Sequence, residues 1–113
     1  MVRRSYIPER GDIVYLTFDP VEGHEQGGRR PAVVLSSRKY NERIGLATVC
    51  PVTSRIKGYP FEVSLFLQGR ISMILCDHLR SVAWKKRRAT FITSASFSVL
   101  SEVIRKIELL LTQ

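Results

Sequence analysis

The chain has few of the residues that form cross-links, metal sites or membrane spans. It has two cysteines, Cys50 and Cys76, and they lack the C-x-x-C spacing of a zinc or redox site. Both lie in apolar runs, TVCPV and ILCDH, so we predict two buried, reduced thiols rather than a disulfide. The opening segment MVRRSYIPERGD has no apolar signal region, and no run approaches the ~18 apolar residues of a membrane span. We therefore expect a soluble, cytosolic protein that does not insert into a membrane.

Negative charge is also scarce. The 113 residues include 18 Lys and Arg against 10 Asp and Glu, which gives a net charge of +8 and a pI near 10.1. An excess of this size in one small domain, residues 1–113, indicates a polyanionic partner. RNA, DNA, an anionic membrane surface or an acidic protein would each fit. The hydrophobic fraction of 44% is enough for a core and argues against disorder.

Several motifs of catalysis are missing from the sequence. It has no G-x-x-x-x-G-K-[ST] loop and no G-x-G-x-x-G at the start of a helix. His24 and His78 stand alone, without the spacing of a metal-binding pair, and none of the serines lies in a nucleophile elbow. These absences argue against a metal enzyme or a triad hydrolase. We predict no metal and no cofactor.

The hydrophobic pattern predicts several short strands followed by one helix. The strands are expected at residues 13–18, 32–36, 46–52, 61–67, 71–77 and 79–84. Segments 38–45 and 54–60 are expected to be loops, and Gln68-Gly69 a hairpin turn. Because the one expected helix follows all the expected strands, the pattern favours a small antiparallel β-barrel over a βαβ sheet.

The C-terminal segment changes to a helical period. Apolar residues recur at spacings of three and four, which predicts one face of an amphipathic helix: Phe97, Leu100, Ile104, Ile107 and Leu111. Either Ser96 or Ser98 can cap its start.

The segment GHEQGGRRP, residues 23–31, has more functional groups than a turn requires. Glu25 is a candidate general base, and Arg30 can offer a charged fork to a phosphate. A base beside a phosphate clamp is what RNA cleavage by its own 2′-hydroxyl needs, without a metal. His24 can share the proton transfer or be a polar surface group. A solvated turn, with charges that only aid solubility, is the competing interpretation.

Two other segments suit nucleic acid. In CPVTSRIKGYPFEV, Arg55 and Lys57 supply cations, and Tyr59 offers a ring on which a base can stack. Phe61 in the same segment can instead begin a strand and face the core. The cluster WKKRR, residues 84–88, can steer RNA by its field or be a solvated charged face.

Taken together, the sequence resembles the MazF/PemK (Kid) family of type II toxin–antitoxin ribonucleases, and the MazF branch in particular. The resemblance rests on three stretches, in this order over nearly the whole chain: ERGDIVYLTFDPVEGHEQGGRRPAVVLS, CPVTSRIKGYPFEV and LCDHLRSVAW. It implies an SH3-like barrel that works as a homodimer. It also implies metal-free cleavage of single-stranded RNA, chiefly mRNA, to 2′,3′-cyclic phosphate and 5′-hydroxyl ends. An acidic antitoxin would bind the dimer and block the site.

The resemblance also assigns roles to residues. Glu25 and Arg30 fall on the catalytic glutamate and arginine of the MazF branch, and Thr53 on a supporting hydroxyl. The further RNA contacts that we predict are His24, Gln26, Arg29, Arg55, Lys57 and Tyr59. Where the PemK branch has Arg-Cys-Asp this chain has Leu75-Cys76-Asp77, so the arginine is missing and a catalytic Asp77 is in doubt.

Two rival functions remain open from the sequence. A basic barrel can bind RNA or an antitoxin without cutting RNA, although the intact Glu25 and Arg30 argue against this. The same barrel also occurs in toxins directed at DNA gyrase, so the fold alone is no evidence for a ribonuclease.

Overall fold

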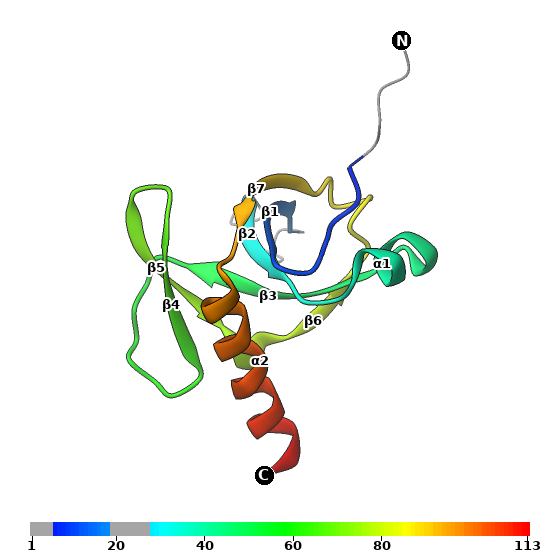
Figure 1. Ribbon diagram of the computed structural model, residues 1–113. Helices are drawn as coiled ribbons and strands as arrows, with labels where there is room; N and C mark the ends of the chain where they lie inside the picture. The colour runs from blue at the N-terminus through cyan, green and yellow to red at the C-terminus, as the bar shows by residue number, and fades with distance from the viewer. Residues whose placement is uncertain (1–5, 19–27) are drawn as a thin grey trace, which may run out of the picture.

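The protein is described by a computed structural model that covers residues 6–18 and 28–113 (Figure 1). The strands of these residues are β1 (Asp12–Thr17), β2 (Arg29–Val34), β3 (Ala47–Thr53), β4 (Glu62–Leu67), β5 (Arg70–Leu75), β6 (Arg80–Val82) and β7 (Thr90–Ser94). The helices are α1 (Arg38–Ile44), a 3₁₀ turn η1 (Cys76–His78) and α2 (Phe97–Thr112). In Figure 1 the β4–β5 hairpin and α1 lie at opposite ends of the molecule.

The strands form one curled antiparallel sheet. Its order is β4-β5-β3-β2-β1-β7, and β6 pairs with β3 beside that path. This mainly β architecture with a C-terminal helix confirms the predicted fold class. Within the described residues, none of the helices is long and apolar enough to cross a membrane.

The central strands are buried on both faces, because alternate residues enter two different cores. In β1, Ile13 belongs to a first core under α2, whereas Val14 and Leu16 belong to a second core. In β2, Val33 and Val34 divide in the same way. Strands buried on both sides are apolar throughout, which explains runs such as PAVVL.

The predicted strands are all present, but the sequence missed β7. The strand pairs with β1, with Thr90 opposite Tyr15 and Ser94 opposite Asp12. Only Ile92 of its five residues is even partly buried, so no alternation of apolar and polar residues marks the strand. Residues 76–78 also leave the predicted strand 71–77 and form η1.

The prediction of a loop at residues 38–45 was wrong, because this segment forms α1. The Ser37 side chain accepts a hydrogen bond from the Tyr40 amide, and Gly45 ends the helix with φ 82°. Asn41 is its one buried residue and donates to Pro8 O at 2.9 Å. The helix therefore buries a polar group, and its sequence carries no apolar stripe.

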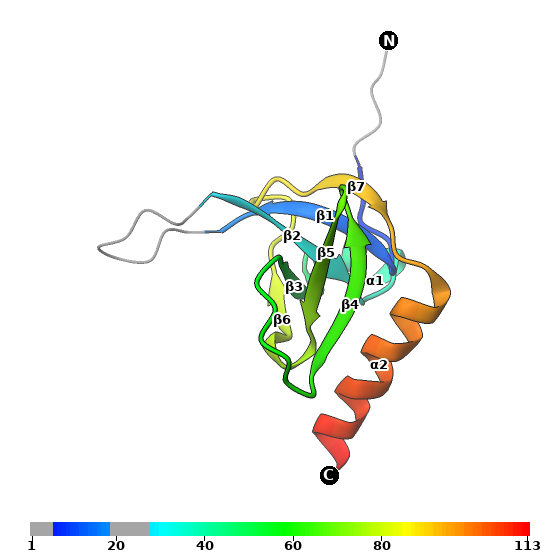
Figure 2. The same ribbon diagram turned by 90° about the vertical axis from the view of Figure 1, so that its left-hand side faces the viewer.

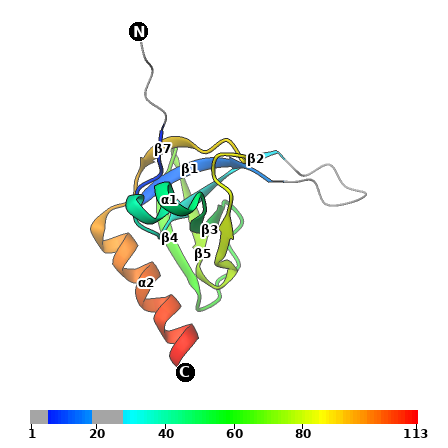
Figure 3. The same ribbon diagram turned by 90° about the vertical axis from the view of Figure 1, so that its right-hand side faces the viewer.

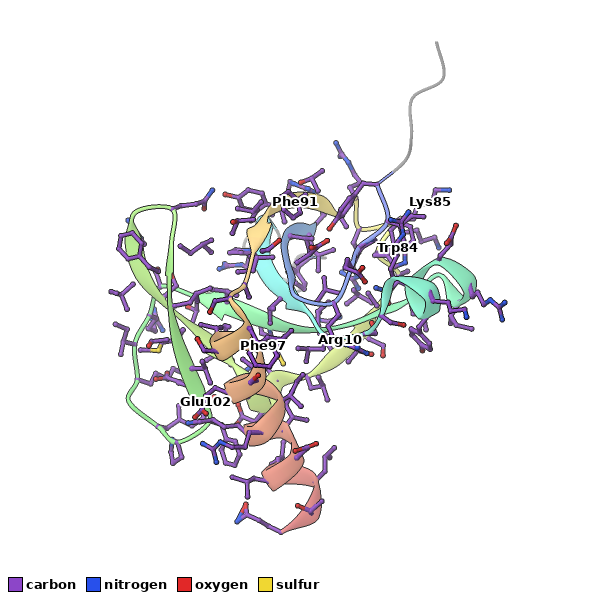
Figure 4. The ribbon with its side chains drawn as sticks, in the orientation of Figure 1. Arg10, Trp84, Lys85, Phe91, Phe97 and Glu102 are labelled. Carbon is purple, nitrogen blue, oxygen red and sulfur yellow. The ribbon has the colours of Figure 1, made fainter. Side chains whose placement is uncertain are left out.

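Trp84 joins α1 to the segment that follows β6 (Arg80–Val82). Its indole N–H donates to Asn41 O at 2.9 Å, and Figure 4 shows its side chain beside α1. Figure 3 shows α1 in front of the sheet on this side of the molecule.

The prediction of α2 was right in position and only partly right in its packing face. Ser96 caps the helix by accepting from the Val99 amide. The residues buried against the first core are Val103 and Ile107, while Phe97 is 85% exposed and Leu111 71%. Figure 2 shows α2 lying along β4. The buried stripe is thus narrower than the apolar pattern of the helix.

Val103→Ala should lower the free energy of unfolding by about 2 kcal/mol, because it leaves a cavity in the first core. Leu111→Ala should change it by less than about 0.5 kcal/mol, because that side chain is already largely exposed. Urea unfolding at one protein concentration measures both variants. A larger loss in Leu111→Ala than in Val103→Ala would mean that α2 packs by the face that the sequence predicts.

The two cysteines are free and buried, which confirms the predicted reduced thiols. The Cys50 Sγ lies 3.7 Å from Cys76 O. Burial raises the pKa of Cys50 to about 12 and that of Cys76 to about 11. Both thiols therefore remain protonated at neutral pH, and thiol reagents react with thiolates.

Neither thiol of the folded protein should react with a thiol reagent at pH 8, while both should react after unfolding in guanidinium. Unfolded thiols ionise near pH ~8.5, below the folded values, so the folded state binds more protons in the alkaline range. Stability should consequently fall as the pH rises from about 9 toward 12. Labelling of the folded protein as fast as free cysteine would contradict this account.

Candidate functional site

A cavity of about 700 Å³ opens where β2 begins and β3 ends. It lies between the β1–β2 pair and the turn of the β4–β5 hairpin. Its lining residues are Tyr15, Gly28, Arg29, Arg30, Pro31, Val52, Thr53, Ser54, Leu67, Gln68, Arg70 and Ser72. The cavity thus gathers Arg30 and Thr53, which the sequence predicted to act together.

The strand pairings show how Arg30 and Thr53 come to line one cavity. Strands β2 and β3 are antiparallel, and their pairing ends with Ala32 opposite Pro51. Beyond this pair β2 continues beside β1, whereas β3 continues beside β5. The cavity opens beyond the last β2–β3 pair, and its lining includes Arg30 of β2 and Thr53 of β3.

The charge of the cavity is of one sign among the described lining residues. Arg29, Arg30 and Arg70 contribute cations, and none of the lining residues named above is an aspartate or a glutamate. A hollow lined by one sign of charge concentrates ions of the other sign. The cavity is suited to an anionic ligand.

The sequence missed several residues of the cavity wall. The Tyr15 hydroxyl donates to Gln68 Oε1 at 3.0 Å and so joins β1 to the hairpin turn across the rim. Arg70 and Ser72 of β5 also line the cavity. The strand pattern assigned these positions to a sheet but gave no indication that the hairpin and the start of β2 line one cavity.

Arg29 has structural partners on its guanidinium, although we predicted an RNA contact. It donates to Thr17 Oγ1 at 2.7 Å, to Arg88 O at 2.7 Å and to Thr90 Oγ1 at 2.8 Å. These bonds join β1, β2 and the segment that leads into β7. The same bonds hold part of the 84–88 cluster in place, so Arg29 has a role in the fold whether or not it also touches a ligand.

The remaining predicted contacts lie on the β3–β4 loop. Arg55 and Lys57 are exposed, and the Arg55 amide donates to Thr53 Oγ1 at 3.1 Å. Tyr59 is partly buried, and its hydroxyl donates to Asp77 Oδ1 at 2.6 Å. Burial and this bond hold the pKa of Tyr59 above its ordinary value. Asp77 thus has a structural partner at the start of η1.

The predicted residues His24, Glu25 and Gln26 lie outside the described residues. Glu25 precedes Gly28 by three residues in the sequence, and Gly28 lines the cavity.

A curled antiparallel sheet with one C-terminal helix and a hollow lined by arginines defines a small β-barrel protein that is suited to a polyanion. Comparison with known proteins makes the class specific. Residues 9–111 match the family described as PemK-like, MazF-like toxins of type II toxin–antitoxin systems. The chain belongs to this family, which confirms the predicted family and the toxin class.

The relatives are named endoribonucleases, the enzyme class predicted from the sequence. The endoribonuclease toxin MazF of Escherichia coli K12 is 49% identical over 90 residues, which are 80% of each chain. The endoribonuclease PemK of Escherichia coli is 33% identical over 119 residues, covering 99% of this chain and 88% of that one. MazF of Deinococcus radiodurans has a crystal structure that superimposes with a TM-score of 0.85 at 50% identity, over 96% of this chain and 100% of that one.

Arg29→Lys should lower the free energy of unfolding by about 1–2 kcal/mol, because an ammonium cannot reproduce the fork that joins Thr17, Arg88 and Thr90. Chemical denaturation measures the loss. Arg43→Lys, an exposed change on α1, is the control and should be nearly neutral. An unchanged stability in Arg29→Lys would show that these bonds are dispensable.

Proposed function

We propose that this toxin is a metal-independent, sequence-specific endoribonuclease that cleaves single-stranded RNA, chiefly mRNA, and so inhibits translation and growth. The observation that carries the proposal is that Arg30 and Thr53 line one cavity, and that the charged residues of its described lining are all arginines. Its family membership and the names of its relatives support the same activity.

In the proposed reaction the RNA supplies its own nucleophile. Glu25 takes the proton of the 2′-hydroxyl, the 2′-oxygen forms a bond to phosphorus, and the bond from phosphorus to the 5′-oxygen breaks. The leaving 5′-oxygen takes a proton from solvent with Arg30 assisting, and Glu25 later returns its proton to solvent. The products are a 2′,3′-cyclic phosphate and a 5′-hydroxyl, and no oxidant, metal or cofactor enters the balance.

The guanidinium of Arg30 acts mainly through charge. Negative charge gathers on the phosphoryl oxygens as the 2′-oxygen attacks, and a fixed cation beside them stabilises the transition state. Arginine keeps its charge at any working pH. The Thr53 hydroxyl, which lines the same cavity, helps to orient the phosphate.

The RNA strand is proposed to continue from the cavity along the β3–β4 loop. Arg55 and Lys57 contact its backbone, and His24, Gln26 and Arg29 are the other RNA contacts in the proposal. Contacts of cations with phosphates are independent of base identity, so the sequence that is cut depends on other groups of these loops.

A homodimer and an acidic antitoxin complete the proposal, acting in the cytoplasm where mRNA is found. MazF of Deinococcus radiodurans has been crystallised as a MazE-MazF complex, and this structure superimposes on the chain with a TM-score of 0.86 at 50% identity. The net charge of +8 suits a partner of opposite sign.

Purified protein should cleave single-stranded RNA in the presence of EDTA. Glu25→Ala should slow cleavage roughly 100- to 10,000-fold through loss of the base. Arg30→Ala should slow it roughly 100- to 1,000-fold through loss of charge stabilisation. Product ends are read by their reactivity: a 5′-hydroxyl accepts phosphate from a kinase, and a 2′,3′-cyclic phosphate resists a phosphatase until its ring is opened by acid.

The controls are Glu42→Ala and Arg43→Ala, two exposed residues of α1 that change the net charge by the same amounts. Both should cleave at the rate of the unchanged protein. Full activity in Glu25→Ala and Arg30→Ala would refute the assigned residues. Binding of RNA without cleavage would favour a binding module, and loss of supercoiling in a gyrase assay would favour a gyrase toxin.

A further inference from the structure

The segment KGYPFE, residues 57–62, contains groups that the proposed reaction leaves unused. It follows Arg55 and joins the cavity wall at Thr53 and Ser54 to the start of β4. Lys57 is proposed above as an RNA contact, but Gly58, Pro60 and Glu62 have no part in the chemistry. The structure gives each of them a contact that fixes the loop.

Glu62 closes the loop on itself. Its side chain is only 9% exposed, and its two carboxylate oxygens accept from the Lys57 amide at 3.0 Å and from the Gly58 amide at 2.9 Å. Two consecutive N–H groups aimed at one carboxylate require a sharp local turn. Gly58 supplies it with φ 80°, a conformation that glycine adopts without strain.

Lys106 ties the same loop to the C-terminal helix. Its ammonium group donates to Pro60 O and to Glu62 O at 3.3 Å. Figure 2 shows the end of this loop turning up into β4 beside α2. A helix that contributes no residue to the cavity lining thus holds one wall of the RNA path.

The third attachment is to η1. The Tyr59 hydroxyl donates to Asp77 Oδ1 at 2.6 Å, and the Cys76 amide donates to Phe61 O at 2.9 Å. Tyr59 is therefore engaged at its polar end, and its partly buried ring fits a role in holding the loop better than a role as a platform for a base.

We propose that Glu62 and Lys106 are positioning residues that order the β3–β4 loop before RNA binds. Arg55 and Lys57 then meet the phosphates from a preformed backbone, which avoids the loss of loop entropy on binding. The helix α2 controls affinity for RNA through this loop, without touching RNA. The inference rests on the proposed ribonuclease function and concerns binding of RNA rather than the chemical step.

Glu62→Gln tests the proposal in the assay on RNA with EDTA. The amide keeps the size of the side chain but has one acceptor oxygen, and its NH₂ group faces the second backbone N–H. KM should rise roughly tenfold, in line with the loss of a charge-assisted hydrogen bond, while kcat changes little. The substitution also makes the protein one charge more positive, so the field alone would lower KM. The added positive charge therefore predicts a lower KM, whereas loss of the loop attachment predicts a higher KM.

Glu42→Gln is the matched control, with the same charge change on exposed α1, and its KM should not rise. A second comparison introduces Glu62→Gln into a variant that already carries Lys57→Met and Arg55→Met. If Glu62 acts through these two cations, its effect on KM should shrink when both are absent. An equal effect in both backgrounds would overturn the proposed route.

Lys106→Met tests the link to α2 and does not depend on the folding of Glu62→Gln. It should raise KM and speed hydrogen exchange at the Lys57 and Gly58 amides, while Lys39→Met on α1 should do neither. Affinity is checked with a strand of the RNA that carries 2′-deoxyribose at the mapped cleavage site. Normal cleavage with unchanged KM in both Glu62→Gln and Lys106→Met would refute this inference, whereas absence of cleavage in the unchanged protein would refute the proposed function instead.

Discussion

The burial of β1, β2 and β3 on both faces is the constraint on which the rest of the structure depends. Ile13 and Val33 enter one core, and their neighbours Val14 and Val34 enter the other. Each fully buried aliphatic side chain contributes about 1.5–3 kcal/mol to the free energy of unfolding. Exposing either face of these strands would therefore strongly destabilise the fold. A sheet that must enclose a core on each side curls, and the curl brings the start of β2 to the end of β3. The cavity is a consequence of that packing.

The cationic side chains of this protein have two different roles: some hold the fold together, and others are available to a ligand. Arg29 donates to Thr17, Arg88 and Thr90 and holds strands together, while its neighbour Arg30 lines the cavity. Lys106 holds a loop to α2, while Lys57 of that loop is exposed. A net charge of +8 therefore overstates the charge that is available to a ligand.

The strands other than β7 could be predicted because each carries a strong local pattern, and the segment at residues 23–31 was singled out as a candidate because its residue types are unusual for a turn. The failures have local causes too. The segment of α1 is polar because its buried residue is Asn41, β7 is almost wholly exposed, and α2 has apolar residues on more than one stripe. In each case the packing partner decides the outcome, and the partner is distant in sequence. The wall formed by Tyr15 and Gln68 was missed for the same reason.

The sequence by itself determined which candidate groups the proposed site can draw on and the order of most elements, because residue type, spacing and turn chemistry are local properties. It placed a candidate base and an arginine in one short segment, and a hydroxyl and two cations in another. Only the tertiary structure decided which of the described groups share a cavity. The curled sheet brings Arg30 of β2 and Thr53 of β3 into one lining, and contacts from α2 and η1 fix the loop of Lys57, because such contacts join residues that the chain itself keeps far apart.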